Sequence, residues 1–149
     1  MKSEVIRDVL AIFMEGIFEE LSVHHNDINF KIECSYLANI IDPCFKNFYG
    51  TLKNVQDIYF IPWDDESIVL TSMKEIARVK PDILSVEIEE DGYIKIYGNC
   101  LNGFTGGSLF FKADHIKIYT EEFETISHEA LLELTDRFWY SGDRAGHIP

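Results

Sequence analysis

Positive charge is scarce in this sequence. Its 149 residues include 13 lysines and arginines against 26 aspartates and glutamates, for a formal net charge of −13. Because the neutralisation of phosphates by lysine and arginine dominates nucleic-acid affinity, we expect no nucleic-acid partner. Disorder driven by charge goes with few aromatic residues, whereas this chain is 13 % aromatic and 46 % hydrophobic. We therefore predict a single globular domain over residues 1–149 with an acidic surface.

Long hydrophobic runs and paired cysteines are also missing. The charged residues that interrupt the apolar stretches near the N-terminus are Glu4, Arg7, Asp8, Glu15, Glu19 and Glu20. A membrane span or a signal peptide needs an uninterrupted apolar segment, so we expect neither, and no membrane contact. Cys34, Cys44 and Cys100 are odd in number and form no CxxC pair, which favours a reducing compartment. We predict a cytoplasmic protein.

The motifs of common catalytic and cofactor sites are absent as well. The sequence has no GxSxG or SxxK motif for a serine nucleophile, and its five histidines are not spaced as metal ligands. The glycine-rich segment at residues 103–107 lacks the lysine of a phosphate-binding loop. Asp82, Glu87 and Glu89 resemble the carboxylate cluster of metal-dependent nucleases, but Glu89 stands where those sites need a lysine. We therefore predict no catalytic residue, no metal and no cofactor.

Periodicity outlines the first half of the chain. Apolar residues at steps of three and four predict an amphipathic helix over residues 4–21, with Ser3 as its N-cap. The period then changes to two, which predicts a strand over residues 28–36. Residues 42–54 are expected to be irregular, and residues 57–63 to form a second strand. Ser72 and Glu75 fit a capping box for a short helix that ends at Val79.

A β-hairpin is predicted over residues 83–98, and its register follows from the sequence. A two-residue turn at residues 91–92 would set apolar side chains opposite charged ones. A three-residue loop at residues 90–92, with Gly92 in the left-handed conformation, instead pairs Ile88 with Ile94 and Glu87 with Lys95. This register gives the hairpin one apolar face.

The remaining elements complete the expected fold. Two strands, over residues 108–112 and 115–120, are expected to extend the same sheet. Ser127 is the predicted N-cap of a last helix with Gly142 as its C-cap, followed by a loosely ordered tail over residues 143–149. Strands in the middle and helices at both ends predict an α+β fold, a mostly antiparallel sheet of five to six strands with an N-terminal and a C-terminal helix packed against it. A parallel doubly wound fold is the alternative.

Uneven negative charge indicates a binding surface. Self-repulsion of this size lowers the stability of a compact chain, and attraction to a basic partner is a common benefit. Aromatic side chains usually carry the affinity beside such charges, so Trp63 and Tyr93 are the expected anchors. The predicted protein-binding residues are Trp63, Asp64, Asp65, Glu66, Glu87, Glu89, Glu90, Asp91, Tyr93, Glu121, Glu122 and Glu124. The alternative is that these are solvated faces that keep the domain soluble.

The class of function follows from these features together. Small size, acidic charge and the lack of a catalytic motif are similar in character to the immunity proteins that neutralise bacterial toxins, a resemblance of composition that involves no particular residue. We expect a non-enzymatic binding protein that occludes a basic protein partner such as a toxin domain. One alternative is a small-molecule-binding or enzymatic domain with a pocket between sheet and helix, lined by Phe30, Tyr36, Phe60 and Phe110. A homodimeric subunit is the other.

Overall fold

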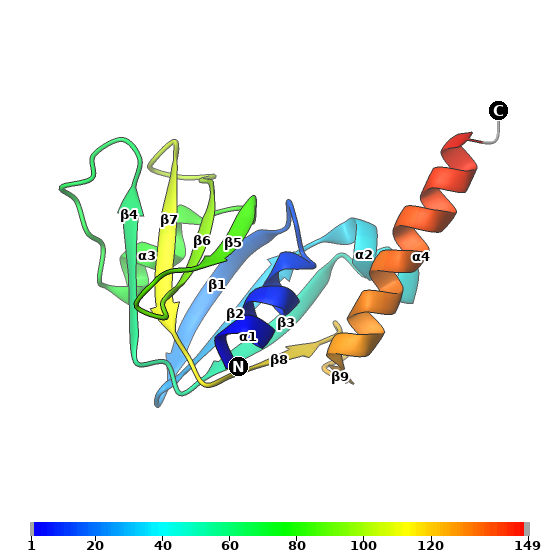
Figure 1. Cartoon of the computed structure of the whole chain (residues 1–149), viewed down its shortest axis with the longest axis horizontal. Coiled ribbons are helices and arrows are strands. Elements are labelled where there is room, and N and C mark those ends of the chain that lie inside the picture. The colour runs from blue at the N-terminus through cyan, green and yellow to red at the C-terminus, as the bar shows by residue number, and fades with distance from the viewer. Residues whose placement is uncertain (1, 148–149) are drawn as a thin grey trace.

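Two antiparallel sheets and four helices make up the described part of the chain. The computed structural model describes residues 2–147, and side chains through residue 139. Five strands form one sheet in the order β1-β2-β3-β8-β9, and four form the other in the order β4-β7-β6-β5 (Figure 1). The strands are β1 (Ile17–His24), β2 (Asp27–Glu33), β3 (Asn47–Lys53), β4 (Asp57–Pro62), β5 (Ser85–Ile88), β6 (Ile94–Asn99), β7 (Gly106–Lys112), β8 (His115–Tyr119) and β9 (Thr125–Ile126). The helices are α1 (Lys2–Ala11), α2 (Ser35–Ile41), α3 (Met73–Val79) and α4 (His128–His147).

The α+β class and the antiparallel pairing are confirmed, but the prediction of one sheet of five to six strands is wrong. The chain between β3 and β8 folds as a sheet of its own, and β8 then pairs with β3 to complete the first one. The predicted strands over residues 108–112 and 115–120 are β7 and β8, which therefore belong to different sheets. All strand pairs of the described chain are antiparallel, so the parallel alternative is wrong.

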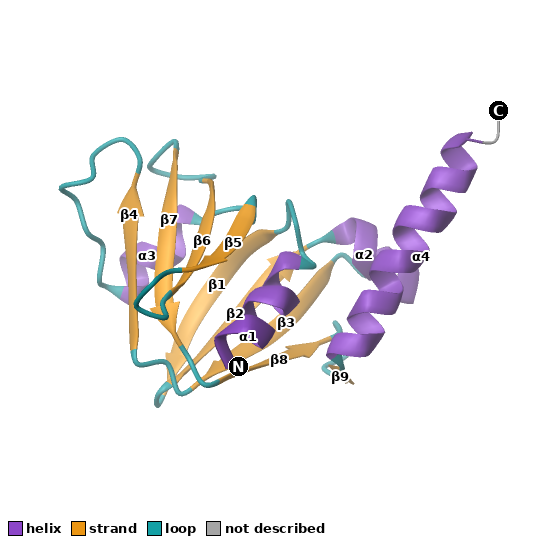
Figure 2. Ribbon diagram, viewed as in Figure 1, coloured by secondary structure: helices purple, strands orange, loops and turns teal. Residues whose placement is uncertain are grey.

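The inner faces of the two sheets share one hydrophobic core. Phe18, Phe30 and Phe48 of the five-stranded sheet and Phe60 and Phe111 of the four-stranded sheet are all buried in it. The first helix, α1, packs against β5 and β8, while α3 packs against β1 and α4 against α2 (Figure 2). Each large apolar side chain contributes about 1.5–3 kcal/mol when buried, so this shared core holds the two layers together.

A backbone seam also joins the two sheets. Glu15 and Ile83 are linked by a hydrogen bond from the Glu15 N–H to the Ile83 carbonyl, of 2.7 Å, and the Ile83 N–H donates to the Gly16 carbonyl at 2.9 Å. The Phe18 N–H donates to the Pro81 carbonyl, also at 2.9 Å. The start of β1 is thereby fixed to the segment that leads into β5.

The predicted helix over residues 4–21 is wrong in its second half, where the chain forms β1. Glu15 adopts a φ of 68°, outside the helical region. Gly16 then passes so close to β2 that a Cβ atom there would lie 2.8 Å from Cγ2 of Ile32. The chain therefore leaves the helix before residue 16.

A β-bulge explains why the sequence of β1 imitates a helix. The register between β1 and β2 shifts between Glu19 and Ser22, so one extra residue is accommodated there. Phe18 and Leu21, three positions apart, are both buried as a result. A spacing of three is the periodicity of a helix, and here a bulged strand produces it.

The next two elements were predicted less completely. The strand over residues 28–36 is confirmed as β2, although α2 already begins at Ser35. The prediction that residues 42–54 are irregular is wrong, because they contain β3, in which Phe48, Gly50 and Leu52 are buried at alternate positions. A Cβ atom at Gly50 would lie 2.2 Å from the ring of Phe30, so glycine is required by the close packing of that ring. Because one of the three buried positions is a glycine, the sequence of β3 does not show the apolar alternation of a strand.

The hairpin and the last helices largely agree with the sequence. Pairing of Ile88 with Ile94 and of Glu87 with Lys95 is confirmed, and Gly92 has a φ of 86°. The predicted strand over residues 57–63 is β4, and the helix that ends at Val79 is α3. These elements are predictable because their pattern is local.

Three of the predicted helix caps differ in the structure. Ser3 is not the N-cap of the first helix, because α1 already begins at Lys2. The Ser72 side chain makes no capping hydrogen bond to α3, so the capping box is wrong. Ser127 does cap α4, since its Oγ accepts from the Ala130 N–H at 3.1 Å. Gly142 is not a C-cap, because α4 continues through His147. The part of the 143–149 tail that lies within the described residues is therefore helical.

Candidate functional site

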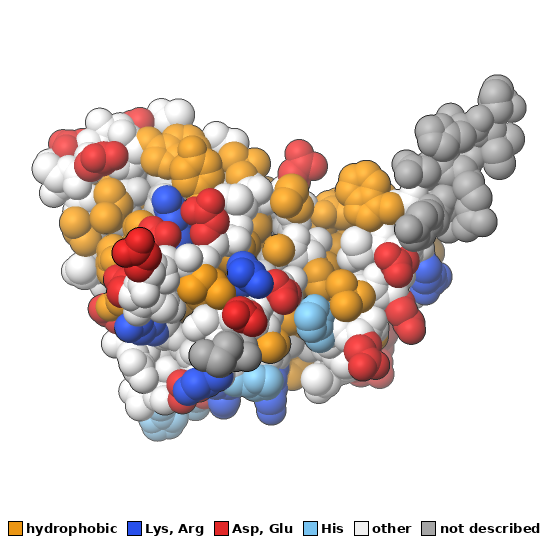
Figure 3. All heavy atoms as spheres, in the orientation of Figure 1, with side chains coloured by type: hydrophobic (Ala, Val, Ile, Leu, Met, Phe, Trp, Pro, Cys, Tyr) orange, Lys and Arg blue, Asp and Glu red, His pale blue; other side chains and the backbone are white. Residues whose placement is uncertain are grey.

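The outer face of the four-stranded sheet carries a set of aromatic side chains. Strand alternation turns Phe60 and Leu109 inward and leaves Tyr59 and Phe110, which are also paired, on the outer side. We name as the aromatic face the outward side chains Tyr59, Trp63, Tyr93, Tyr97 and Phe110. Hydrophobic side chains, acids and lysines lie together over the four-stranded sheet in Figure 3. Trp63 and Tyr97 are exposed, and the other three rings are half-buried. A contiguous aromatic surface of this kind on an outer sheet face is typical of a binding site.

The rings of the aromatic face contact one another across the strands. Tyr59 stacks on Phe110 with centroids 4.9 Å apart and ring planes 14° from parallel, and Tyr93 lies 5.8 Å from Tyr59. At the other end of the face, Trp63 lies 4.8 Å from Tyr97. Gly106 makes this contact possible, because a Cβ atom there would lie 2.3 Å from the Trp63 ring. Neighbouring rings hold each other in place, so the surface is pre-organised.

Two lysines of the same face lie over these rings. The Lys95 Nζ is 5.5 Å from the ring centroid of Tyr97 and 5.9 Å from that of Phe110, and the Lys112 Nζ is 4.7 Å from that of Tyr93. These distances fall within the range of cation–π interactions. The rings of this surface therefore already act as platforms for cations.

Carboxylates surround one end of the aromatic face. The Tyr93 hydroxyl donates a hydrogen bond to Asp57, and this contact raises the pKa of Tyr93 to about 12. Burial, and then the negative charges of Asp91, Asp57 and Glu89, raise the pKa of Tyr59. Negative charges thus contribute to both shifts, because carboxylates gather where β4 begins and the β5–β6 hairpin turns.

A hollow opens at this end, beside the tip of the hairpin. Its volume is about 540 Å³, and it is lined by Tyr59, Phe110, Glu89, Glu90 and Asp91. The stacked rings form an aromatic wall, and the hairpin tip supplies three carboxylates. The arrangement suits a ligand that is flat and positively charged.

The structure brings part of the predicted site together. Glu87 and Tyr93 lie on the outer side of the hairpin, and Glu87 pairs with Lys95 at 4.0 Å. Trp63 stands on the same face as they do, next to Tyr97. Together with the three carboxylates of the hollow, these predicted residues form one continuous surface.

A second predicted group lies at the opposite end of the aromatic face. Asp64, Asp65 and Glu66 follow β4 and are exposed, whereas the hairpin tip lies beside the start of that strand. A strand of this length spans about 20 Å. Asp64 accepts from the Thr105 N–H at 3.1 Å. Hydrogen bonds from Ser67 lower the pKa of Asp65. Local contacts of these carboxylates thus order their own loop.

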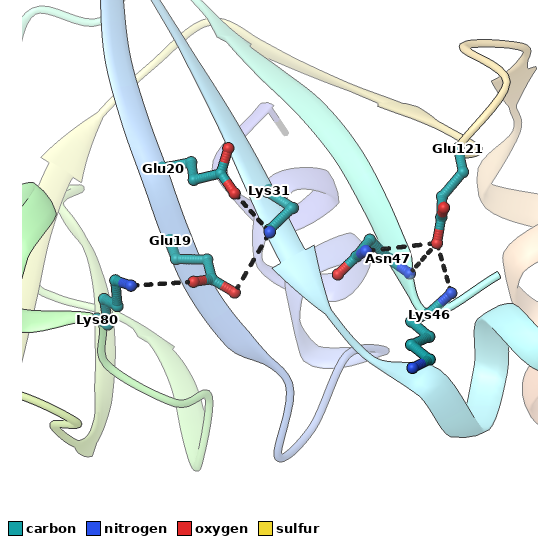
Figure 4. Close-up of polar contacts among 7 residues, drawn as sticks. All are labelled: Glu19, Glu20, Lys31, Lys46, Asn47, Lys80 and Glu121. Atoms are coloured by element: carbon teal, nitrogen blue, oxygen red, sulfur yellow. Dashed lines mark hydrogen bonds and ion pairs between the residues drawn. The ribbon is translucent and has the colours of Figure 1, made fainter.

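The third predicted group is not part of this surface. Glu121, Glu122 and Glu124 lie in the connection between β8 and β9, in the five-stranded sheet. The Glu121 carboxylate accepts from the backbone N–H groups of Lys46 and Asn47, at 2.5 and 2.7 Å (Figure 4). The hydrogen bond from Lys46 is the main cause of a lowered pKa of Glu121. This residue closes a loop of the fold.

The outer side of the five-stranded sheet carries an ion-pair network. Glu19 is only 7 % exposed, and its carboxylate lies 3.8 Å from the Lys31 Nζ and 3.5 Å from the Lys80 Nζ (Figure 4). Lys31 also pairs with Glu20. Because Lys80 caps α3 and Glu19 belongs to β1, the network links a helix to a strand. This is the geometry of a structural contact.

The predicted interface did not include Tyr59, Tyr97 or Phe110, and Phe110 was assigned to the alternative pocket instead. A signal for Tyr97 was present, since Tyr93, Lys95 and Tyr97 alternate with apolar Ile94 and Ile96 and so share the outer side of the hairpin. Tyr59 and Phe110 meet only because β4 pairs with β7. In the sequence, β5 and β6 lie between these two strands. No local pattern reveals that contact.

The four residues of the alternative pocket do not line one cavity. Phe60 is fully buried and faces the core, whereas Phe110 lies on the opposite side of the same sheet. Phe30 is also buried in the core, and Tyr36 packs against Phe138. The prediction of a pocket between sheet and helix that is lined by these four residues is therefore wrong.

Within the described residues, no three His, Cys, Asp or Glu side chains converge in a way that would hold a metal ion. None of the helices in the 2–147 segment combines the length and hydrophobicity of a membrane crossing. Comparison of the chain with family models, with curated proteins and with solved structures finds no match.

Proposed function

We propose that this chain is a non-enzymatic binding protein that uses the aromatic face to bind a basic protein partner. The observation that carries the proposal is the placement of five aromatic side chains on one outward sheet face, with carboxylates of the hairpin tip and of the β4 end at its margins. Desolvated aromatic contacts usually supply most of the affinity of an interface, and charge supplies the rate and selectivity of encounter. The two are combined here on one surface.

The charge of the whole chain supports a basic partner. A net charge of −13 attracts cationic proteins from a distance and repels acidic ones. The finer proposal is that the chain is an immunity-type protein of the cytoplasm that occludes a toxin domain. A basic enzyme surface built to hold a polyanion is complementary to an acidic plug with an aromatic centre.

The direct test is to recover partners without assuming their identity. Fragments of the genome that encodes the chain can be displayed on phage and selected on the full-length protein, and each recovered fragment then purified. We expect cationic fragments whose affinity falls about tenfold or more between low and high salt, because screening shortens the electrostatic range to about 10 Å near 0.1 M. Cationic fragments with salt-independent affinity, or a set of acidic fragments, would refute the proposal.

Matched variants locate the contact. Tyr97→Ala removes a ring that is 38 % exposed on the aromatic face, and Phe123→Ala removes one that is 65 % exposed and stacked on Tyr49 in the other sheet. Tyr97→Ala should weaken binding of a recovered fragment about tenfold or more, as expected for an aromatic anchor. Phe123→Ala should leave it unchanged. If Phe123→Ala weakened binding and Tyr97→Ala did not, the interface would lie on the five-stranded sheet.

A further inference from the structure

The hollow at the hairpin tip differs chemically from the rest of the aromatic face. At the Trp63–Tyr97 end the rings are exposed and a lysine lies beside them. At the hollow the stacked rings of Tyr59 and Phe110 meet carboxylates from the hairpin. Lysines lie near rings at both ends of the face, and what distinguishes the hollow is an open volume lined by two rings and three acidic residues.

The chain's own lysines show what such rings accept. Lys95 lies over Tyr97 and beside Phe110, and Lys112 lies over Tyr93. Among the described residues, neither lysine covers Trp63 or Tyr59. Of these two rings, Tyr59 is the one that lines the hollow. Its hydroxyl end lies in the negative field of Asp91, Asp57 and Glu89. A cation supplied from outside the chain fits at this position.

Shape and charge together distinguish arginine from lysine as the source of that cation. A guanidinium group is planar, so it stacks on an aromatic ring, and its fork of N–H donors matches two oxygens of a carboxylate. An ammonium group is a compact and strongly hydrated charge that gains less from a flat wall. The hollow is lined by Tyr59 and Phe110, whose rings stack face to face, beside the three acidic residues of the hairpin tip.

We propose that the hollow receives an arginine side chain of the basic partner, stacked on Tyr59 and paired with the carboxylates of Glu89 and Glu90. The inference rests on the proposed function and adds to it the residue type that the partner presents. Asp91 holds the turn, because its carboxylate accepts from the Tyr93 N–H at 3.2 Å. The hollow is therefore formed before the arginine enters.

The experiment uses a probe that does not depend on knowing the partner. Isotope-labelled full-length protein is titrated with acetyl-glycyl-arginyl-glycinamide, and amide and ring NMR shifts are followed. The controls are the same peptide with lysine or with citrulline, the uncharged isostere of arginine. We expect shift changes at residues 89–93 and at the Tyr59 and Phe110 rings, with affinity about threefold lower for lysine and tenfold or more lower for citrulline. Equal binding of the citrulline peptide, or shifts confined to another surface, would overturn the assignment.

A matched pair of variants separates the hollow from general charge. Glu89→Gln with Glu90→Gln removes two carboxylates of the hollow, and Glu122→Gln with Glu124→Gln removes two from the β8–β9 connection, so both variants lose the same charge. Only the first should abolish the arginine shifts, and equal effects would overturn the proposal. A recovered basic fragment whose affinity survives the first variant but not Tyr97→Ala would refute the arginine site and leave the proposed function standing. If the protein recovers acidic fragments but still binds the arginine peptide, the proposed function is refuted and the arginine site stands.

Discussion

Glu19 shows how a single carboxylate is accommodated in a poorly hydrated place. It is 7 % exposed, and burial of an ion is costly unless opposite charges compensate for it. Lys31 and Lys80 approach it from two different elements, at 3.8 and 3.5 Å. Glu20, its neighbour, pairs with the same Lys31 but its side chain is 58 % exposed. The two acids share a partner and differ in burial.

This difference gives a prediction at the residue scale. Glu19→Gln keeps the shape of the side chain but leaves two ammonium groups without their shared partner, so the free energy of unfolding should fall by about 1–3 kcal/mol. Glu20→Gln should cost less than about 0.5 kcal/mol, since exposed ion pairs contribute little. Urea unfolding of both variants measures the two values. Equal losses would show that burial of Glu19 has no energetic consequence.

Among the elements, the β5–β6 hairpin depends on the backbone conformation of one glycine. Gly92 has a φ of 86°, which residues with a Cβ atom adopt only at a cost. Gly92→Ala should therefore lower the free energy of unfolding by about 1 kcal/mol or more, and Glu90→Ala in the same loop should stay within about 0.5 kcal/mol. Thermal unfolding of both proteins compares them. An unchanged melting temperature for Gly92→Ala would mean that the loop relaxes to another turn.

The hairpin was predictable because all its information is local. Placing Ile88 opposite Ile94 and Glu87 opposite Lys95 selects one loop length, and the structure has that register. β1 was not predictable, because its bulge gives the spacing of a helix. β3 was not recognised in the sequence because Gly50 interrupts its apolar alternation. In the structure, a ring from β2 fills the space that a side chain at Gly50 would take. Helix and strand patterns fail where a neighbouring element decides the geometry.

The candidate site, like the fold, was predictable only where the pattern is local. Tyr93 and the hairpin acids follow from the alternation of one element, and Trp63 from its position beside an acidic run. The Tyr59–Phe110 stack requires β4 to pair with β7, which sequence alone does not specify. Glu121 was grouped with these acids by charge, yet it bonds to the backbone of another loop. Charge along a chain indicates a surface, and only tertiary pairing decides which charges meet.

At the scale of the whole molecule, self-repulsion sets the dependence of stability on salt. A net charge of −13 on a chain of this length opposes compaction, and screening weakens that opposition. We expect the urea midpoint to rise when sodium chloride increases from about 0.02 to 0.5 M, where the Debye length falls from over 20 Å to about 4 Å. The Glu122→Gln, Glu124→Gln variant should respond less. A midpoint that falls with salt would mean that ion pairs such as those of Glu19 outweigh the repulsion.

The insertion of the four-stranded sheet between β3 and β8 fixes the order in which translation delivers the parts. β1, β2 and β3 leave the ribosome before the four-stranded sheet, and one side of β3 then stays open from the synthesis of Lys53 until that of His115. At about 5–20 residues per second this interval lasts on the order of 3–12 s. An open strand side is a template for the same strand of a neighbouring nascent chain. The hazard of aggregation is therefore greatest while this protein is being made, and it ends when β8 covers β3.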